Sequence, residues 1–443
     1  MKPLKAFGIA GPAGSLAAAL LCLHAALSPA RSADPAGPVT FPDLVAPALP
    51  QLRWQSLWDG QSWQGWHRIG KGDWTIEGGA IVGRHAQSEG EFSHLVSDRA
   101  YKDFAVRLKF KAVRGNSGLY FRVAETGFSG VTGFQAEIDA SRDVGGLYET
   151  NGRGWVVQPQ PEAVATWFRP GEWNEMVVIA FGDSVNVLVN GKLSARLAGD
   201  PGRPAGCFAL QAHGGQEVEV QFKDLEVATP VELLPGPNLE TWRSPVGEWQ
   251  MAGSVALDAA RPGKLAASSG LGTLYNGPRG STRNLFTGLE HGDVLAHVEF
   301  MIPEKSNSGV YFMGRYEIQV YDSCGVAKDQ YPGIECGGIY PRWVNNHELE
   351  GHSPAVNVSR PPGQWQTFDV AFRAPRFQDG RKTAPACFTR VVHNGAVIHE
   401  RVAVSGPTRA AAFEDEKPLG PLFLQGDHGP VAYRNLWLLP LAD

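Results

Sequence analysis

The sequence predicts an all-β protein built from two tandem β-sandwich domains of the jelly-roll type. Three observations predict this fold class. They are an internal repeat, short segments in which apolar and polar residues alternate, and abundant turn residues, with 53 Gly and 32 Pro among 443 residues. Many short strands with turn signals between them are typical of sandwiches and jelly rolls. Outside the N-terminal segment, no stretch shows a long apolar stripe of helical period.

The internal repeat consists of motifs that recur in the same order. Asn-Ser-Gly-aliphatic-Tyr-Phe occurs at 116–121 and again at 307–312, an offset of 307 − 116 = 191. Gly-Gly-aliphatic-Tyr at 145–148 returns with an offset of 337 − 145 = 192, and Gly-x-Trp at 171–173 returns with an offset of 363 − 171 = 192. The chain therefore carries two copies of one domain.

The second copy is longer because two segments have been added to it. The Asn-Gly pair at 190–191 matches the pair at 394–395, an offset of 394 − 190 = 204, which places one insertion at 376–384. His213 and His428 are offset by 428 − 213 = 215, which places another at 406–417. Such additions belong in loops, since a strand interior cannot absorb them without losing register. The predicted domains are 51–230 and 238–443.

The predicted strands are segments in which apolar and polar residues alternate. They lie at 104–111, 177–181, 185–189, 218–222, 294–300, 310–312, 368–372 and 388–393. The two Asn-Gly pairs predict two-residue hairpin turns, because both residue types tolerate the positive φ angles of a type I′ turn. A curved sheet of this kind offers a groove, lined by alternate residues, that suits a sugar.

The N-terminal residues have the pattern of an export signal. Lys2 and Lys5 precede a largely apolar run at 13–27, and small residues follow, so we expect a signal peptide at 1–33. Residues 34–50, rich in Pro and Ala, are predicted to form a linker. The pattern indicates export to the bacterial periplasm or the extracellular space, with no membrane span in the mature chain. The net charge of −5 argues against a nucleic-acid partner.

Two cysteines of the second copy are candidates for a disulfide. Cys324 and Cys336 lie 336 − 324 = 12 positions apart in a loop-like region. A bond between them is predicted for an oxidising compartment, and two free thiols are the alternative. The cysteine spacing is not that of a metal site.

Further motifs complete a resemblance to a known family. The second copy reads Tyr-Glu-Ile-Gln-Val-Tyr-Asp at 316–322 and Leu-Gln-Gly-Asp-His-Gly at 424–429, and the first reads Gly-Phe-Gln-Ala-Glu-Ile-Asp at 133–139. Together with the repeated motifs, they resemble the 3-keto-disaccharide hydrolase family, whose domains are similar in fold to the concanavalin A-like lectins and glucanases. The resemblance covers 54–229 and 242–441. In the first copy, the Asp that precedes His428 in the second has no counterpart before His213.

The resemblance implies a reaction on a sugar that carries a ketone at C3. The proton at C2 is then acidic, a general base removes it, and the enolate expels the C1 substituent by β-elimination. Addition of water to the unsaturated product makes the net result hydrolysis. Such a site needs one base and stabilisation of the enolate oxygen, with a divalent cation such as calcium or manganese as an optional Lewis acid. No nicotinamide is expected, because no hydride moves.

Alternation within the predicted strands places polar side chains on one face of each copy. Gln135, Glu137 and Asp139 share a face in the first copy. If Phe134 aligns with Tyr316, then Gln135 matches Glu317 and Glu137 matches Gln319, so the two copies carry Glu and Gln in swapped order. This face is expected to meet a ligand, with a plain solvated sheet face as the alternative.

The second copy is expected to be the active one because it has more polar candidates. His428 is the first candidate for the base, since imidazole titrates near neutral pH, and Glu317 is the second. Asp427 could orient His428 or bind a metal. Asp322 is the candidate metal ligand, because oxygen ligands suit calcium or manganese. A structural loop histidine bonded to the backbone is the alternative for His428.

The remaining candidates would contact the substrate. Aromatic faces stack on sugar rings, and arginines or a histidine can bind hydroxyls or a keto oxygen. A place in the core is the alternative for the aromatics, and surface ion pairing is the alternative for the arginines. These candidates are Tyr340, Trp343, Trp155, Arg122, Arg315, Arg153, His213 and Gln319.

Three functions are consistent with these residues. The first is an exported enzyme that cleaves 3-keto-glycosides. The second is a non-catalytic, lectin-like carbohydrate-binding protein. The third is a conventional glucanase that uses Glu137 and Asp139 as its two carboxylates, which the swapped Glu and Gln order disfavours.

Overall fold

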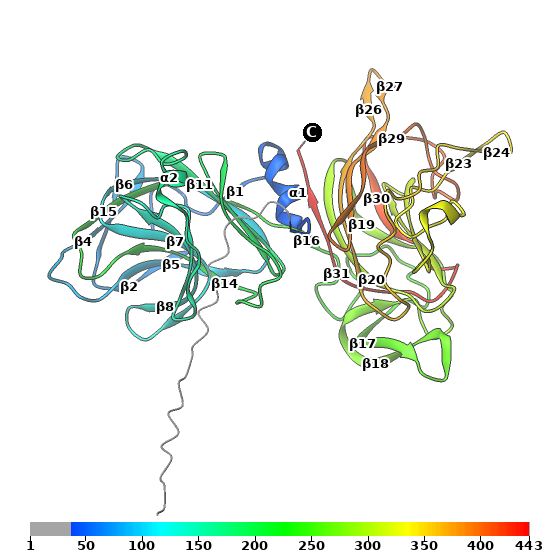
Figure 1. Ribbon diagram of the computed structural model, residues 1–443, viewed down its shortest axis with the longest axis horizontal. Coiled ribbons are helices and arrows are strands. Elements are labelled where there is room, and N and C mark those ends of the chain that lie inside the picture. The colour runs from blue at the N-terminus through cyan, green and yellow to red at the C-terminus, as the bar shows by residue number, and fades with distance from the viewer. Residues whose placement is uncertain (1–36, 443) are drawn as a thin grey trace, which may run out of the picture.

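The computed structural model describes residues 37–442 and contains two β-sandwich domains with a short helix between them (Figure 1). Each sandwich consists of two antiparallel sheets, so the predicted all-β fold with two tandem domains is confirmed. The predicted signal peptide at 1–33 lies outside the described residues. Within the described part of the chain, no helix is long and apolar enough to cross a membrane.

The first domain packs an eight-stranded sheet against a seven-stranded one. In spatial order the larger sheet contains β13 (Lys192–Leu197), β12 (Ser184–Val189), β11 (Asn174–Phe181), β6 (Phe104–Arg114), β15 (Val218–Ala228), β4 (Ala80–His85) and β3 (Asp73–Glu77), and β1 (Gln55–Ser56) pairs with β15. The other sheet contains β10 (Gly154–Val157), β9 (Leu147–Thr150), β8 (Gly130–Asp139), β7 (Asn116–Thr126), β14 (Gly206–Ala212), β5 (Ser93–Tyr101) and β2 (Trp66–Gly70). A short helix, α2 (Pro161–Val164), follows β10.

The second domain repeats this arrangement with a smaller second sheet. Its larger sheet contains β17 (Gln250–Asp258), β18 (Arg261–Tyr275), β31 (Ala432–Pro440), β20 (Val294–Met301), β25 (Gln366–Arg373), β28 (Ala386–His393) and β29 (Ala396–Val404), and β16 (Val231–Glu232) pairs with β31. The four-stranded sheet contains β19 (Leu285–His291), β30 (Gly420–Leu424), β21 (Asn307–Phe312) and β22 (Tyr316–Tyr321). Two hairpins and a 3₁₀ turn stand apart: β23 (Arg342–Val344) with β24 (His347–Leu349), β26 (Arg376–Gln378) with β27 (Arg381–Ala384), and η2 (Lys328–Gln330).

The predicted insertions and turns of the second copy are found where the offsets placed them. The insertion at 376–384 is the β26–β27 hairpin, and the one at 406–417 lies in the loop between β29 and β30. Both Asn-Gly pairs have positive φ at each residue, 49° and 77° in the first domain and 50° and 84° in the second. These values fit the predicted type I′ turns. Strand β16 belongs to the second domain, which therefore begins earlier than the predicted residue 238.

The prediction of a linker at 34–50 is wrong from residue 41 onward. Residues Phe41–Ala48 form helix α1, which a 3₁₀ turn, η1 (Leu49–Gln51), extends. The Asp43 carboxylate accepts a hydrogen bond from the Thr40 backbone amide at 2.9 Å, and this contact stabilises the start of the helix. The helix is too short for its period to stand out in the sequence. Burial supplies most of its stability.

Helix α1 joins the two domains through a shared apolar cluster. It contacts β11 and β12 of the first domain and β20 and β25 of the second. The Phe41 ring lies 4.8 Å from that of Phe181 in the first domain and 4.2 Å from that of Trp437 in the second. Leu188 and Leu439 belong to the same buried cluster. The domains are therefore packed against each other through a core of their own.

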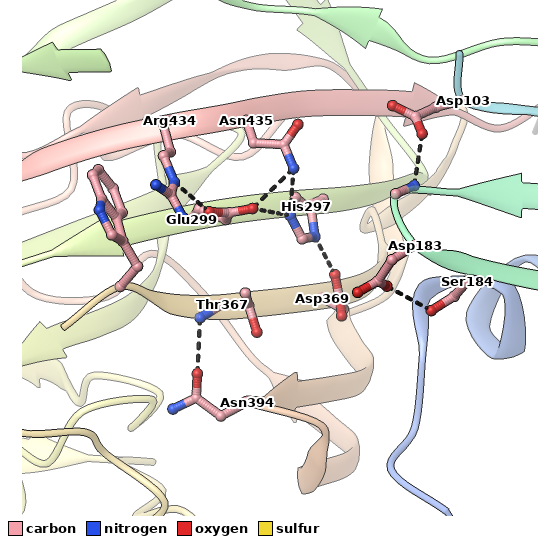
Figure 2. A network of polar contacts seen from close by, with 12 residues as sticks. Asp103, Asp183, Ser184, His297, Glu299, Thr367, Asp369, Asn394, Arg434 and Asn435 are labelled. Atoms are coloured by element: carbon pink, nitrogen blue, oxygen red, sulfur yellow. Dashed lines mark hydrogen bonds and ion pairs between the residues drawn. The ribbon is translucent and has the colours of Figure 1, made fainter. Parts of the chain in front are cut away.

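A buried ion-pair network lies beside this cluster (Figure 2). His297 Nδ1 lies 2.5 Å from an Asp369 carboxylate oxygen, and His297 Nε2 lies 3.7 Å from Glu299. The imidazole stacks on Trp437, with 5.1 Å between ring centroids. Burial alone would lower the pKa of His297, but Asp369 and Glu299 outweigh it and raise this pKa to about 9. A charged histidine therefore sits at the boundary between the domains.

We expect Asp369→Asn to lower the free energy of unfolding by about 3 kcal/mol or more, because a buried imidazolium would lose its closest carboxylate. The matched control is Asp98→Asn, which breaks a His67–Asp98 pair of similar length, 2.6 Å, whose side chains are exposed. Exposed pairs contribute at most about 1 kcal/mol. Denaturant unfolding of both variants measures the difference, and equal losses would contradict this account of the interface.

Candidate functional site

A cavity of about 670 Å³ lies on one face of the seven-stranded sheet of the first domain. Side chains of this sheet alternate between the two faces. Leu119, Phe121 and Ala136 point into the sandwich core. Their neighbours Tyr120 and Gln135 line the cavity instead. The cavity is thus on the outer face, where the alternation of polar residues predicts a ligand-binding face.

The register of β7 and β8 confirms the predicted alignment of the two copies. Gly118 lies opposite Glu137 and Tyr120 lies opposite Gln135. In the second domain, the corresponding Gly lies opposite Gln319 and the corresponding Tyr lies opposite Glu317. The Glu and Gln order is therefore swapped between the domains, as the sequence predicts.

The Asn-Ser-Gly motif of the first domain has both a steric and a polar role. A Cβ at Gly118 would lie 2.5 Å from Gln135 Nε2, so glycine leaves room for that side chain. The Asn116 amide donates to the Glu137 carboxylate. The Ser117 hydroxyl donates to the Gln211 carbonyl at 2.6 Å, which ties β7 to β14. The motif therefore positions the polar groups of the outer face.

Glu137 is a buried carboxyl group at the cavity, with a side chain that is 4% exposed. Burial raises the pKa of Glu137 to about 8, the Asn116 hydrogen bond opposes this shift, and the carboxylates of Asp139 and Asp143 add to it. No cation contributes to the shift. A carboxyl with a pKa near neutral can take up and release a proton at working pH.

His94 is a cavity residue that sequence reasoning missed. Its Nδ1 lies 3.0 Å from the Ser129 carbonyl and therefore carries the proton, while its Nε2 is buried and has no hydrogen-bond partner. Burial lowers the pKa of His94 to about 4, so the ring is neutral at working pH. Its position on β5, directly opposite Gln211 of the repeated motif, was the available signal. Strand β5 itself was not among the strands that alternation predicts.

Polar and aromatic groups complete the cavity around these two residues. The Gln211 amide donates to the Tyr120 hydroxyl at 2.8 Å, and the Gln135 amide donates to the Gln211 side-chain oxygen at 3.3 Å. Trp155 lies opposite Tyr148 on the neighbouring strand, with their rings edge to face and 5.3 Å between centroids. The structure thus brings Trp155, Gln135 and Glu137 together, as the sequence predicts for substrate contacts.

His213 also lines the cavity, but its hydrogen bond is to the backbone. Its Nδ1 lies 2.6 Å from the Gly214 carbonyl, and its ring packs edge to face on Phe92 at 4.6 Å. Burial lowers its pKa.

The second domain holds the same polar pair in a more enclosed setting. Glu317 is 2% exposed and accepts a hydrogen bond from the Tyr311 hydroxyl at 2.6 Å. The Gln319 amide donates to the Asn307 side chain at 2.7 Å, which mirrors the Asn116–Glu137 contact. Burial raises the pKa of Glu317 to about 8. The two glutamates are thus alike in pKa and differ in access.

Larger side chains occupy the outer face of the second domain. Phe423 lies opposite Tyr311 where the first domain has Ala209 opposite its tyrosine. The Phe423 and Tyr311 rings stack at 4.0 Å, and the Phe286 ring lies 4.9 Å from Phe423. The first domain has Val96 at the position of Phe286. Aromatic rings therefore fill space that small residues leave open in the first domain.

The insertion at 406–417 adds a cover over this face. Its Arg409 carbonyl lies 3.4 Å from the Tyr311 hydroxyl, and its Thr408 hydroxyl contacts the Glu317 backbone amide at 3.2 Å. Phe413 packs against Phe286 with 6.4 Å between centroids. The inserted loop therefore lies over the carboxyl group that the sequence offered as a second base.

The other predicted catalytic residues lie in an exposed loop. His428 Nδ1 lies 2.6 Å from Asp427, so the predicted contact between them exists. Both side chains are about half exposed, whereas Glu317 is buried. His428 and Asp427 are therefore more accessible than Glu317, and the expectation that the second copy holds the active site stays a prediction.

The predicted roles of the arginines in substrate binding are wrong for Arg122 and Arg315. Both are 2% exposed and have structural partners. Arg122 donates to the backbone carbonyls of Lys102 and Gly182, each at 2.9 Å. Arg315 donates to the Met313 carbonyl at 2.7 Å and to the side chain of Asp415 at 2.9 Å, which fastens the insertion. Their buried guanidinium groups donate hydrogen bonds to backbone carbonyls of two tight turns.

Arg153 and Asp139 are also engaged elsewhere. Arg153 forms a two-pronged ion pair with Asp200, at 2.6 and 2.9 Å, and pairs with Glu149. Asp139 closes a turn by accepting hydrogen bonds from the backbone amide and hydroxyl of Ser141, both at 2.5 Å. Asp139 is not among the residues that line the cavity, where a glucanase would place its second carboxylate beside Glu137.

Of the predicted aromatic contacts of the second domain, Trp343 is exposed and Tyr340 is half-buried. The Arg409 guanidinium lies over the Trp343 ring at 4.5 Å, so that ring already has a cation partner from the insertion. The Tyr340 backbone amide donates to the Glu317 carbonyl at 3.2 Å. Both aromatics lie near the inserted segment 406–417 of the second domain, and neither lines the first-domain cavity.

The predicted metal ligand and the two cysteines have the following surroundings in the structure. Asp322 accepts a hydrogen bond from the Lys305 backbone amide at 2.9 Å. Among the described residues, no group of three or more His, Cys, Asp and Glu side chains is placed to hold an ion. Cys324 and Cys336 are both free thiols, so the predicted disulfide is wrong. Cys336 points into the core of the second domain, while Cys324 stays at a partly exposed turn.

Comparison with known proteins identifies a matching family and several similar structures. The profile of the 3-keto-alpha-glucoside-1,2-lyase-like domain matches residues 53–228 and again 229–439. Among solved structures, a candidate glycosyl hydrolase of Parabacteroides distasonis is 24% identical, with a TM-score of 0.36, and the match covers 48% of this chain and 85% of that one. The carbohydrate-binding module CBM66 of Bacillus subtilis is 19% identical, with a TM-score of 0.29, and the match covers 36% of this chain and 93% of that one.

No match was found among curated proteins. The two profile matches together cover most of the chain, and they coincide with the two sandwiches. They confirm the family that the repeated motifs predict. The chain therefore belongs to the 3-keto-alpha-glucoside-1,2-lyase-like domain family, and it carries two tandem copies of that domain.

Proposed function

We propose that this protein cleaves the glycosidic bond of 3-keto-glycosides and 3-keto-disaccharides in the cavity of the first domain. The observation that carries the proposal is Glu137, a buried carboxyl group with a pKa raised to about 8 that faces a cavity large enough for a sugar. The family name, which refers to a 1,2-lyase of 3-keto-alpha-glucosides, supports elimination rather than direct hydrolysis. We further propose that the protein is exported.

The proposed reaction begins with proton transfer to Glu137. The ionised carboxylate takes the proton from C2 of the sugar, and the electron pair passes to the C3 oxygen as an enolate. Collapse of the enolate restores the C3 ketone and forms the C1–C2 double bond as the C1–O bond breaks. The departing oxygen takes a proton from solvent. Water then adds its hydroxyl group to C1 while C2 regains a proton, so the products are those of hydrolysis. A base with a pKa near working pH suits both directions of proton transfer.

Neighbouring groups of the cavity would stabilise the enolate that forms at C3. The Tyr120 hydroxyl accepts hydrogen bonds from Gln211 at 2.8 Å and from Thr150 at 3.2 Å, which leaves its own proton to donate. Burial raises the pKa of Tyr120, so it remains a neutral donor at working pH. The His94 Nε2 atom has no partner but is buried, so a sugar hydroxyl could bond to it only after a small displacement of the cavity lining. Fixed donors such as the Tyr120 hydroxyl favour a transition state with developing negative charge.

The second domain would then support rather than perform the reaction. Its Glu317 lies beneath the insertion, and Phe423 and Phe286 fill the outer face. Among the three functions that the sequence allows, the glucanase loses its second carboxylate at Asp139. A carbohydrate-binding protein without catalysis is the remaining competitor.

We expect the purified protein to release the aglycone from a methyl 3-keto-glucoside and to leave the unoxidised methyl glucoside intact, because only the ketone makes the C2 proton acidic. Both sugars are assayed with and without EDTA, and loss of activity in EDTA would place a cation in the site. Cleavage of the parent alone would overturn the elimination route. If the protein binds either sugar but cleaves neither of them, it is a lectin.

A further inference from the structure

The first-domain cavity has a wall that the second domain lacks. Between Phe121 and Phe134 the chain extends strands β7 and β8 into a long hairpin, residues 122–133. In the second domain, only residues 313–315 separate Phe312 from its partner Tyr316. Five residues of the long hairpin line the cavity, namely Thr126, Phe128, Ser129, Gly130 and Val131.

Two exposed phenylalanines stand at this wall. Phe128, at the hairpin turn, is 65% exposed, and Phe92, in the segment before β5, is 37% exposed. They are the only exposed phenylalanines in the part of the chain that the structure describes, and both line this cavity. Large apolar side chains that gather at an exposed site mark a binding surface.

The backbones that carry the two rings are fixed by one glycine. The Gly70 amide donates to the Phe128 carbonyl at 3.1 Å. A Cβ at Gly70, whose φ is +77°, would collide with the Phe92 carbonyl oxygen. Phe92 and Phe128 are therefore held next to each other by a close approach of three segments. The backbone positions that carry the two rings are thus set before any ligand arrives, which reduces the entropy lost on binding.

The cavity lining combines polar and apolar surface. Glu137, Asn116 and Gln211 supply hydrogen-bonding groups, and Trp155 offers an aromatic face. Phe92, Phe128 and Val131 add apolar surface, and the Ser129 carbonyl is already bonded to His94. A polar group that is buried against apolar surface without a hydrogen-bond partner costs free energy, whereas a flat apolar group meets no such cost.

We propose that the substrate is a 3-keto-glycoside with a planar aromatic aglycone, whose sugar lies at Glu137 and whose aglycone lies against Phe92 and Phe128. This proposal rests on the proposed function, because it takes Glu137 as the place of the sugar. It goes beyond the disaccharides that the family resemblance implies. Aromatic rings favour such contacts through both buried area and ring geometry.

The test compares a 4-nitrophenyl, a methyl and a disaccharide form of the same 3-keto-glucoside. The expected result is a KM about tenfold lower for the 4-nitrophenyl form than for the disaccharide. KM is compared because 4-nitrophenolate is the better leaving group and raises kcat by itself. In Phe128→Ala, the KM for the 4-nitrophenyl form should rise about tenfold while the methyl form keeps its KM. The matched control is Leu271→Ala, which removes an exposed apolar side chain of the second domain and should change neither of these two KM values.

An equal KM for the disaccharide and the 4-nitrophenyl form, or an equal change for methyl and aryl substrates in Phe128→Ala, would overturn the proposal while leaving the proposed function in place. If no 3-keto-glycoside is cleaved, the proposed function fails, and titration calorimetry with the unoxidised 4-nitrophenyl and methyl glucosides decides the question. Tighter binding of the aryl glucoside that Phe128→Ala abolishes supports the aromatic subsite. Equal binding of the two glucosides contradicts it.

Discussion

Glu137→Gln is expected to lower kcat for a 3-keto-glucoside by about 10²- to 10⁴-fold, the range that a positioned general base contributes. The amide keeps the size of the side chain and a hydrogen bond with Asn116, but it cannot take the C2 proton. KM should change little, since the cavity retains its other contacts. Steady-state kinetics on the two proteins measure both quantities.

The chain supplies its own control for this experiment. Glu317 is the buried carboxyl of the second domain, and burial raises its pKa to about 8, as it does for Glu137. Glu317→Gln should leave kcat within about twofold, because that carboxyl lies beneath the insertion and bonds to Tyr311. A large loss in Glu317→Gln with none in Glu137→Gln would move the active site to the second domain.

Activity is expected to rise about tenfold per pH unit below pH 8 and to level off above it. The base must be ionised to accept a proton, and the Glu137 carboxyl, whose pKa burial raises to about 8, is mostly protonated at lower pH. A pH profile of kcat/KM measures this dependence. A profile that is flat between pH 5 and pH 8 would contradict the assignment of Glu137, because a carboxyl with an ordinary pKa would already be ionised.

The free energy of unfolding should fall as the pH rises, which is opposite to the trend in activity. The folded-state pKa of Glu137 lies above its ordinary value of 4.5, so the folded protein binds a proton that the unfolded chain releases. The stabilisation is complete below about pH 4.5 and is lost as the pH rises through about 8. Glu317 acts in the same direction, and so does His297, whose pKa rises from 6.5 to about 9. The unfolding midpoint should therefore fall from pH 6 to pH 9, and less steeply in Glu137→Gln.

Repeats and alternation made the fold predictable from the sequence. The motifs at 116–121 and 307–312 form the same strand pairing in both domains, and their glycines leave room for Gln135 and Glu317 on the neighbouring strands. Those motifs also set the register, so the swapped order of Glu and Gln follows from the amino-acid sequence alone. Helix α1 could not be predicted from the sequence, since its eight residues depend on burial between two domains rather than on a local pattern.

The candidate site was predictable only in part. Alternation identified Gln135 and Glu137, but it could not show that Ala209 leaves a cavity open where Phe423 fills the same space in the second domain. Access depends on what packs above a sheet, and the residues that decide it lie far apart in the sequence. His94 was missed for the same reason: its role follows from the Nε2 atom that burial leaves without a partner.

The most direct test of the central claim is the mass of the product released in heavy water. If Glu137 removes the C2 proton and water adds after elimination, the sugar released at early times should carry one deuterium at C2 in the wild type and in Glu317→Gln. Glu137→Gln should form neither product nor deuterated substrate. A product that retains hydrogen at C2 and forms without any transient enone absorbance would show direct hydrolysis of the glycosidic bond, and it would contradict the elimination that this account assigns to the first domain.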